Sequence, residues 1–415
     1  MKIPLGYGKT SIDFEFDPKQ FEMLSTEIEM SPLSDHQIGE RLDHPFGVEL
    51  ETTIKPGESV LIVVPDATRE IGCGQIVNLL VRRLIANGTM PHDINIIFAT
   101  GIHRPVTQEE KQEILTPFVA QRIKTLDHNP KDLMQIVRIG KTDSGIPVEL
   151  NRRLTEYDHK IIIGGINFHY FAGFTGGRKS ICPGLASART ISETHKLAFD
   201  CGKKTRRDGV GTSKLTGNPV HEAFIEVVEK CPPTFAINTF VNDRGEIIEL
   251  ICGHWKTSHE QACRVYEKNN TIKLTEKRDF VIVSCGGFPH DLNLIQAHKA
   301  LDMASHACND GGTIVFLAQC ENGLGRNDFA DWFKARDSEA LADRLCDNYQ
   351  VNGQTAWSLL KKAENFDIRI ITDLPREIAN QMRLRKIESL IDITNTVETG
   401  YIMPFGAKFN IELVQ

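Results

Sequence analysis

The sequence predicts an α/β protein of two domains, each with a mixed, largely parallel sheet flanked by helices. Short apolar runs alternate with longer stretches of helical periodicity, which is the pattern of this fold class. The chain has 415 residues, which is enough for two hydrophobic cores. The alternation restarts after the charged stretch 268–278. We therefore expect domains at 1–275 and 276–415, with the functional site in the cleft between them.

The individual elements follow from apolar runs and the turns that flank them. In the first domain, strands are predicted at 60–64, 94–98 and 160–163, helices at 75–86 and from Gln108, and a hairpin at 235–251. In the second domain, strands are predicted at 280–284, 312–318 and 368–372, and helices at 292–307 and 328–345. Gly88 is expected to close the helix at 75–86, because glycine readily adopts the left-handed conformation of a helix end.

Composition and charge argue against several classes of protein. The formal net charge of −7 does not suit a general nucleic-acid binder. The N-terminal residues lack the apolar segment of a secretory signal, and no run approaches about 18 apolar residues, so we expect no membrane span. The ten cysteines include no C-x-x-C pair, so neither a zinc knuckle nor a disulfide framework is predicted. Scattered thiols fit a reducing compartment, and we expect a cytoplasmic protein.

Four conspicuous polar stretches each follow directly after a predicted strand. They are DATRE from Asp66, ATGIHRP from Ala99, NFHYFAGFTGGRKS from Asn167 and FPHDLNLIQ from Phe288. In open α/β sheets, ligands bind beyond the carboxyl ends of the strands. We therefore expect all four loops to converge on one crevice at that edge.

The stretch from Gly173 to Ser180 is close to the phosphate-binding P-loop, G-x-x-x-x-G-K-[ST], but departs from it twice. Arg178 replaces the second glycine, and Pro183 interrupts the helix that should follow at once. An ordinary ATPase or GTPase therefore loses support. The glycines still let an anion approach backbone N–H groups, and Arg178 and Lys179 favour one. The alternative is a flexible connector, although ordering so many glycines costs entropy.

Three histidines are candidates for chemistry. His103 and His169 lie in loops after strands, and an unperturbed histidine titrates near neutrality, so either suits a general acid or base. His195 lies in a helical segment with small residues on one side. Taken singly, each is explained as well or better as a structural or surface residue. One histidine is also a poor metal site, because catalytic zinc usually has three protein ligands.

Two further pairs of polar residues have a structural and a functional interpretation. Asp66 and Arg69 form either a helix cap with a salt bridge or, given their place after a strand, contacts to a ribose hydroxyl and a substrate carboxylate. Gln296 and Lys299 are three residues apart and share one face of a helix. That face is either solvated or directed at a ligand.

Taken in order along the chain, five motifs resemble those of the nickel-pincer-nucleotide-dependent lactate racemase family. They are DATR, ATGIHRP, HYFAGFTGGRKSICPG, TISETH and Q-x-x-K. Each is weak alone, but the five in this order are specific and span nearly the whole chain. The resemblance implies an isomerase, a racemase or epimerase that inverts the Cα centre of a small 2-hydroxy acid by reversible hydride transfer through a keto acid.

The resemblance also implies a cofactor, pyridinium-3,5-bisthiocarboxylic acid mononucleotide carrying nickel, and the enzymes that make it as partners. One histidine ligand is then sufficient, because the cofactor supplies the others, and an imidazole suits four-coordinate nickel. The N-terminal domain would bind the cofactor and carry out catalysis. The corresponding residues are Asp66 for the ribose, Thr175, Gly176 and Gly177 for the phosphate, Lys179 for the covalent link and His195 for nickel.

By the same resemblance, His103 and His169 are a catalytic pair on opposite faces of the substrate. In the family mechanism one histidine removes the hydroxyl proton while hydride leaves Cα for the pyridinium ring. Hydride then returns to the other face of the planar keto acid as the second histidine supplies a proton. The protein orients the reactants, and the cofactor takes the difficult step.

The substrate contacts implied by the resemblance come from both predicted domains. Arg69 and Lys299 would hold the carboxylate, with Gln296 nearby. Ile295 departs from the family pattern, because lactate-acting members carry a tyrosine there. We therefore expect a 2-hydroxy acid other than lactate, or larger than it.

Three other functions stay open at this point. A phosphate-binding NTPase-like protein would need a conforming P-loop. A nicotinamide dehydrogenase would need the G-x-G-x-x-G fingerprint after an early strand, which is missing. A non-catalytic carrier of the nickel-pincer cofactor would need Lys179 and His195 but neither His103 nor His169.

Overall fold

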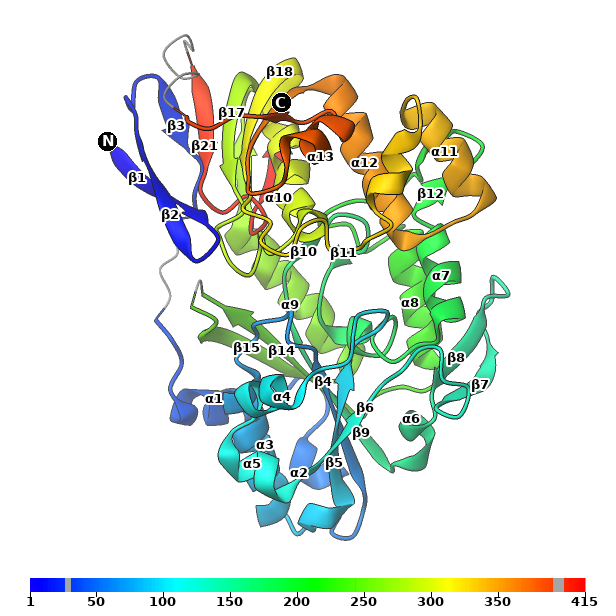
Figure 1. Cartoon of the computed structure of the whole chain (residues 1–415). Helices are drawn as coiled ribbons and strands as arrows, with labels where there is room; N and C mark the ends of the chain where they lie inside the picture. Colours follow the sequence, from blue (N-terminus) through cyan, green and yellow to red (C-terminus); the bar gives the residue numbers. More distant parts are fainter. Residues whose placement is uncertain (27–30, 243, 391–398, 415) are drawn as a thin grey trace. The chain divides into compact units, whose positions relative to one another are not determined.

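The structure, a computed structural model, describes residues 1–26, 31–242, 244–390 and 399–414. It divides into two compact units, whose elements are labelled in Figure 1. Unit 1 comprises residues 1–28, 198–207 and 267–415, and unit 2 comprises residues 29–197 and 208–266. Each unit contains a six-stranded sheet with helices packed on it.

Unit 2 contains the following elements. Its helices are α1 (Asp35–Leu42), α2 (Leu50–Thr53), α3 (Cys73–Ala86), η1 (Pro91–Asp93), α4 (Gln108–Ile114), α5 (Pro117–Arg122), α6 (Arg153–Glu156), η2 (Gly177–Ser180), α7 (Ala188–Lys196), α8 (Pro219–Glu229) and α9 (Trp255–Asn270), which continues into unit 1. Its strands are β4 (Val60–Pro65), β5 (Ile94–Ala99), β6 (Lys124–Asp127), β7 (Ile136–Lys141), β8 (Pro147–Asn151), β9 (His159–Gly165), β10 (Phe168–His169), β11 (Gly173–Phe174), β14 (Phe235–Val241) and β15 (Ile247–Gly253).

The sheet of unit 2 has the strand order β15-β14-β9-β4-β5-β6. Its neighbours are parallel except for β14 and β15, which form the predicted hairpin. The chain passes from β4 through β5 to β6 and then places β9 on the other side of β4. The strand order therefore reverses between β9 and β4. In open α/β sheets such a switch point is where ligands bind.

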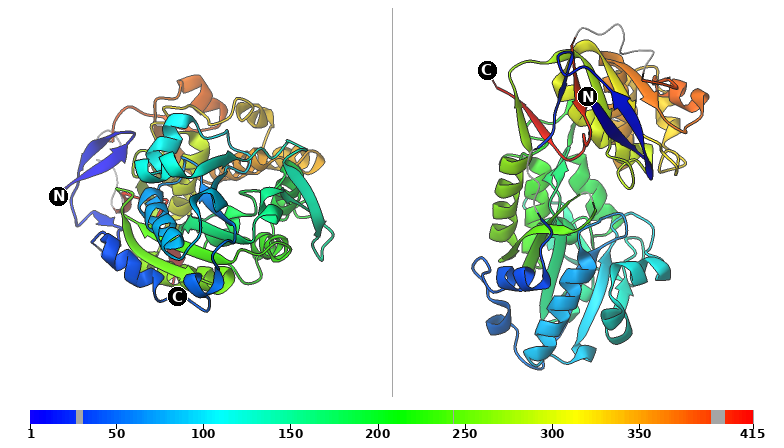
Figure 2. Two further views of the ribbon diagram at one scale, coloured as in Figure 1. Left: turned by 90° about the horizontal axis from the view of Figure 1, so that it is seen from below. Right: turned by 90° about the vertical axis from the view of Figure 1, so that its left-hand side faces the viewer.

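Apolar residues account for the central part of this sheet. The β4 residues from Val60 to Val64 are all fully buried, as expected of a strand covered on both faces. The helix α3 buries Ile76, Leu80 and Leu84, whose spacing puts them on one side of the helix. Figure 2 (right) shows this helix, in blue, lying along the strands. The helix ends at Ala86, and Gly88 has a φ of 95°, so the predicted helix end is confirmed.

Unit 1 contains the remaining elements. Its strands are β1 (Lys2–Tyr7), β2 (Thr10–Glu15), β3 (Phe21–Met23), β12 (Phe199–Asp200), β13 (Thr205–Arg206), β16 (Thr271–Leu274), β17 (Arg278–Ser284), β18 (Cys308–Leu317), β19 (Asp367–Ile371), β20 (Arg385–Lys386), β21 (Gly400–Met403) and β22 (Asn410–Leu413). Its helices are α10 (Leu294–Ala307), η3 (Ala330–Lys334), α11 (Ser338–Asp347), α12 (Val351–Asn365) and α13 (Arg376–Gln381). The sheet order β20-β19-β18-β17-β21-β3 is parallel throughout.

The division into units differs from the predicted boundary at residue 275. Residues 1–28 belong with the C-terminal part of the chain, because β3 pairs with β21 in register Phe21 to Gly400. Figure 1 shows the blue β3 beside the red β21. Residues 198–207 also belong to unit 1, although both of their neighbouring segments lie in unit 2. Pairing between strands so far apart in sequence leaves no local signal, so the prediction of two contiguous domains missed it.

The predicted helix at 328–345 is wrong as a single element. It is divided into η3 and α11, because Asp337 adopts an extended conformation and caps α11 by accepting a hydrogen bond from the Ala340 N–H at 2.8 Å. The other predicted strands and helices are confirmed to within a few residues. Among the described residues, no helix combines the length and the apolar character needed to cross a membrane.

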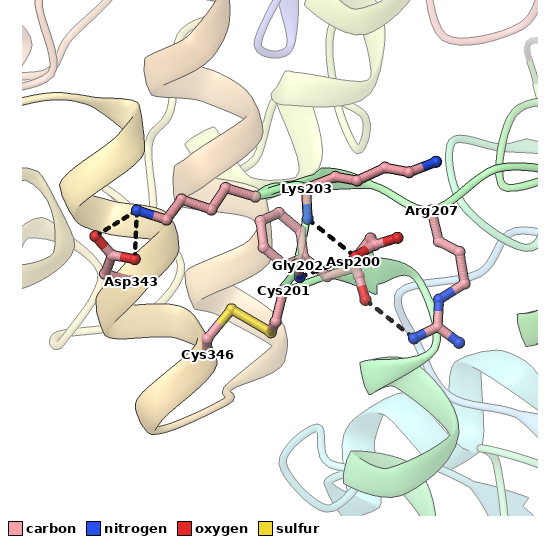
Figure 3. The surroundings of a disulfide bond; sticks show 9 residues. Asp200, Cys201, Gly202, Lys203, Arg207, Asp343 and Cys346 are labelled. Carbon is pink, nitrogen blue, oxygen red and sulfur yellow. Dashed lines mark hydrogen bonds and ion pairs between the residues drawn. A yellow bond between two sulfur atoms is a disulfide. The ribbon is translucent and has the colours of Figure 1, made fainter.

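Cys201 and Cys346 form a disulfide, shown in Figure 3. It joins the β12–β13 hairpin to α11 within unit 1, and Lys204 of the same hairpin forms an ion pair with Asp343 at 2.7 Å. The expectation that the scattered cysteines form no disulfide is wrong for this pair. Disulfides depend on spatial proximity, and these two residues are 145 positions apart in sequence. The other eight cysteines are buried and form no disulfide among the described residues.

Candidate active site

Three of the four predicted loops follow neighbouring strands of the unit 2 sheet. Asp66 directly follows β4, the loop of His103 follows β5, and the loop of His169 follows β9. Because these strands are parallel neighbours, their loops leave the same edge of the sheet, at the switch point. The fourth loop, from Phe288, follows β17 of the unit 1 sheet. One shared sheet edge was therefore a correct expectation for three loops and a wrong one for the fourth.

Asp66 and His103 form a hydrogen-bonded pair. His103 Nδ1 lies 2.7 Å from Asp66 Oδ2, and Thr68 donates to the other carboxylate oxygen through its N–H and its hydroxyl. Burial favours the neutral acid, but the hydrogen bond from His103 and the charges of His103 and Arg69 outweigh it and lower the pKa of Asp66 to about 2. Asp66 is therefore an ionised group that orients His103. Sequence position alone did not reveal this role.

The turn of Thr175, Gly176 and Gly177 is built against the end of β9. The Thr175 hydroxyl donates to the Gly165 carbonyl at 2.7 Å. Gly176 has a φ of 72°, and a Cβ there would lie 3.1 Å from the Gly165 carbonyl oxygen. A Cβ at Gly177 would lie 2.4 Å from the ring of His259. Both positions therefore require glycine. The first N–H groups of the short helix η2 have no acceptor within the helix, which suits a bound anion.

Arg178 lies beneath this turn and is only 1% exposed. Its guanidinium donates to the Ala172 carbonyl at 2.7 Å and to the Thr175 carbonyl at 3.4 Å, and it lies 3.0 Å from His259 Nε2. Burial lowers the pKa of His259 well below its ordinary value, so this imidazole is neutral. Its Nε2 lies 3.0 Å from both the Arg178 guanidinium and the Thr175 carbonyl, and the tautomer decides whether it accepts from the first or donates to the second. The sequence suggested that Arg178 is available to an anion. The structure shows instead that Arg178 binds two carbonyl groups of the loop. It also shows that His259, which no motif had indicated, lies against Arg178.

Lys179 and His195 share two aromatic neighbours. Lys179 Nζ lies 5.7 Å from the ring centre of Phe171 and 5.8 Å from that of Phe224. The His195 ring lies 5.2 and 5.4 Å from the same two rings. An amine and an imidazole from different motifs are thus brought together. Phe224 lies on α8, where no sequence motif indicated a site residue.

The hydrogen bonding of His195 fixes which nitrogen is available. Nδ1 lies 2.7 Å from the Ile191 carbonyl, one turn earlier in α7, so Nδ1 carries the proton and Nε2 keeps its lone pair. Burial, and then the charge of Lys179, lower the pKa of His195 to about 3. His195 is therefore a neutral imidazole, which is the state that a metal ligand requires. Metal-binding histidines commonly donate their other N–H to a backbone carbonyl in this way.

His169 joins this group through Phe171. The two rings meet edge to face, with their centres 4.3 Å apart. His169 Nδ1 accepts the N–H of Ala172 at 3.3 Å, so the ring proton is assigned to Nε2. The neutral His169 ring therefore has its proton on Nε2, whereas the neutral His103 ring, whose Nδ1 is bonded to Asp66, has its lone pair on Nε2.

The loop of His103 is attached to the segment that carries Lys179. The Gly101 N–H donates to the Gly184 carbonyl at 2.9 Å, and the Gly184 N–H donates to the Lys179 carbonyl at 3.0 Å. Gly101 has a φ of 54°, a conformation that glycine tolerates best. In unit 2, three loops and the helix α7 thus carry the predicted catalytic and cofactor residues, and these segments contact one another.

The predicted substrate residues Gln296 and Lys299 lie in unit 1, at the start of α10. Asn293 caps this helix by accepting the Gln296 N–H at 3.0 Å. Lys299 Nζ donates to Gln296 Oε1 at 2.7 Å, so the two side chains share one face, as predicted. Ile295 is partly buried and packs against the hydrophobic core of unit 1.

Comparison with known proteins places the chain in a family. Residues 7–206 match the lactate racemase N-terminal domain, and residues 274–400 match the lactate racemase C-terminal domain. The lactate racemase of Lactiplantibacillus plantarum is 30% identical over 332 residues, which cover 79% of this chain and 77% of that protein.

The chain belongs to the lactate racemase family. The lactate racemase of Thermoanaerobacterium thermosaccharolyticum is 28% identical over 351 residues, which cover 83% of this chain and 80% of that protein. The structure of the lactate racemase apoprotein from this organism superimposes with a TM-score of 0.89 at 25% identity, covering 99% of this chain and all of that one. A protein from Thermotoga maritima, with a TM-score of 0.70 at 19% identity, covers 93% of this chain and all of its own and shows the fold alone.

Membership in the lactate racemase family makes this protein an isomerase, a racemase of the lactate-racemase-like type. It also confirms the predicted fold class, α/β with mixed, largely parallel sheets flanked by helices.

The Asp66–His103 pair predicts how acid destabilises the protein. The pKa of Asp66 is lower in the folded chain, about 2, than the ordinary 3.8, so its stabilising effect is present above pH 3.8 and is lost as the pH falls through 2. Asp66→Asn should therefore lower the free energy of unfolding by about 2 kcal/mol at pH 5, and the gap to the wild type should close towards pH 2. Urea denaturation at both pH values measures it. The exposed Asp310→Asn is the control, and an equal gap at both pH values would contradict the assignment.

Proposed function

We propose that this member of the lactate racemase family is a racemase or epimerase that inverts the Cα centre of a small 2-hydroxy acid with a nickel-pincer nucleotide linked to Lys179. The observation that carries the proposal is the placement of Lys179 and His195 against the same two rings, Phe171 and Phe224. An amine for covalent attachment then stands beside a neutral imidazole for nickel. The glycine turn directly before Lys179 suits the phosphate of a nucleotide.

The residues of unit 2 fit such a cofactor. Among the described residues, no group of three or more His, Cys, Asp or Glu side chains is arranged to hold a metal ion. A cofactor that brings its own sulfur and carbon ligands needs only one imidazole, and His195 Nε2 offers it. Asp66 would hold the ribose, because a carboxylate accepts about four hydrogen bonds and keeps capacity beside Thr68 and His103. When bound, the pyridinium ring would supply a reversible acceptor for hydride from Cα.

His103 and His169 present complementary nitrogen atoms for the proton steps. The bond from His103 Nδ1 to Asp66 leaves a lone pair on Nε2, which can take the substrate hydroxyl proton. The ionised Asp66 stabilises the imidazolium that results. His169 would act as an imidazolium: it would give its Nε2 proton to the oxygen of the keto acid on the other face and become neutral, so that one of the two histidines is protonated before and after each turnover. In the reverse direction the two histidines exchange these roles, as a racemase requires.

We propose that cationic and amide side chains bind the substrate. Arg69 would hold the substrate carboxylate through paired hydrogen bonds, and Lys299 would supply a second positive charge. Lys299 already donates to Gln296, which sets its direction. The aliphatic Ile295 offers no hydroxyl to a substrate. We therefore propose that the preferred substrate is a 2-hydroxy acid other than lactate, or larger.

The alternatives lose support in the structure. The glycine turn leads into η2, which has only four residues, whereas a P-loop continues into a long helix. A carrier of the cofactor has no use for the Asp66–His103 pair, whose carboxylate is held ionised. The proposal accounts for both features.

Nickel content should separate the roles of the three histidines. His195→Ala should lower the nickel retained by protein produced with the cofactor-making enzymes by about tenfold or more, because it removes the protein's ligand. His103→Ala and His169→Ala should retain nickel but lose turnover. Elemental analysis by mass spectrometry measures this, with His36→Ala, an exposed position on α1, as the control. Equal nickel loss in all three variants would overturn the division of roles.

A panel of single-enantiomer substrates tests the reaction and its substrate. Holoenzyme is incubated in D2O with lactate, malate, 2-hydroxybutyrate, phenyllactate and a sugar acid, and inversion is followed by chiral chromatography. Because one added methylene group changes selectivity by roughly 10–200-fold, neighbouring homologues should differ modestly. We expect an acid other than lactate to be inverted fastest, with its original Cα hydrogen retained. Lactate as the best substrate by a wide margin would refute the inference from Ile295, and heavy deuterium incorporation would refute hydride transfer.

A further inference from the structure

A cavity of about 550 Å³ lies entirely within unit 1, where α10, α12 and β22 contribute to its lining. Cavities of this volume accommodate small organic molecules. Asp302 and Lys362 are among its lining residues and are 1% and 9% exposed. None of the residues assigned to the racemase reaction lines it.

Positive charge predominates in this cavity. Lys362 Nζ lies 2.5 Å from Asp302 Oδ1, and the Arg206 guanidinium lies 3.4 Å from the same oxygen. Lys277 and Lys361 add two more cations to the lining, and neither forms an ion pair within the part of the chain that the structure describes. Four cations therefore face one carboxylate. Lys277 is half-buried and Lys361 is exposed, so this excess of positive charge is accessible to a ligand and attracts an anion.

The second carboxylate oxygen of Asp302 indicates what else a ligand of this cavity has to provide. Both cations approach Oδ1, whereas Oδ2 is buried and accepts no hydrogen bond from the described residues. His306, also in the lining, adds no charge, because burial lowers its pKa. A ligand that satisfies this site has to donate a hydrogen bond to Asp302 as well as carry negative charge.

The remaining wall is apolar and is held in place by the disulfide-linked hairpin. Trp357 and Phe366 line the cavity. Trp357 is packed edge to face against Phe199, with ring centres 4.9 Å apart. Phe199 pairs with Arg206 across the hairpin, whose tip carries Cys201 of the disulfide shown in Figure 3. The disulfide-linked hairpin thus positions the Arg206 guanidinium and also Phe199, which packs against Trp357 of the cavity wall.

We propose that this cavity is a second ligand site, which binds a small organic anion that also carries a hydroxyl group. Its phosphate or carboxylate group would lie among Arg206, Lys277 and Lys361, and its hydroxyl would donate to Asp302 Oδ2. The carbon skeleton would contact Trp357. This site depends neither on the cofactor nor on the racemase reaction.

Calorimetric titration of the full-length protein tests the proposal with two pairs of probes. Glycerol 3-phosphate is compared with propyl phosphate, and malate with succinate, so that each pair differs in its hydroxyl groups. We expect one hydroxylated anion to saturate a single site, and its partner without the hydroxyl to bind about tenfold more weakly or worse. Which pair responds identifies the ligand as a phosphate or a carboxylate. The absence of saturable binding by both hydroxylated anions, or equal affinity within the responding pair, would overturn the proposal.

Variants locate the binding. The double variant Lys277→Gln, Lys361→Gln changes side chains that are not buried, so it should fold, and it should weaken binding at least about tenfold. Lys334→Gln, at an exposed position of unit 1 outside the cavity, is the matched control and should bind as the wild type does. Lys299→Gln should also leave binding unchanged, which separates this site from the proposed substrate residues. Binding that survives the double variant, or is lost with Lys299→Gln, would place the ligand elsewhere and refute the cavity site.

Discussion

The close packing of one glycine turn against the end of β9 is the constraint on which the proposed site depends. A Cβ at Gly164 would lie 2.9 Å from Gly176 Cα, so the two backbones meet only because both residues are glycine. The Thr175 hydroxyl donates to the last residue of β9, and the buried Arg178 tethers the carbonyls beneath the turn. The Ser180 hydroxyl, at the other end of η2, donates to the Ile163 carbonyl at 3.2 Å. This short segment is therefore held at both ends.

Holding the turn fixes the direction of Lys179 and, through its aromatic neighbours, its relation to His195. Burial then decides the protonation states. It lowers the pKa of His195 so that the imidazole is neutral, while hydrogen bonds and nearby positive charge keep Asp66 ionised despite its burial. The proposed reaction requires a neutral ligand and an oriented base, and contacts within unit 2 supply both.

Much of this organisation could be predicted from the sequence, because its signals are local. The apolar run of β4 and the polar loops after the strands of unit 2 lie where periodicity and strand ends place them. What could not be predicted depends on pairing across the chain. The pairing of β3 with β21, the Cys201–Cys346 disulfide and the ring of Phe224 beside Lys179 have no signature within their own segments. The burial of Arg178 also could not be predicted. It depends on packing against the distant His259, and a basic residue in a glycine-rich loop is usually expected to be exposed.

Peptide mapping tests whether Lys179 anchors the cofactor beside His195. The protein is produced with the cofactor-making enzymes, digested and analysed by mass spectrometry, with Lys179→Arg as the matched variant. We expect an added mass on the peptide that contains Lys179 and on no other lysine. The Lys179→Arg variant should lack both the added mass and the activity. A fully active sample in which Lys179 is unmodified would refute the covalent link to Lys179.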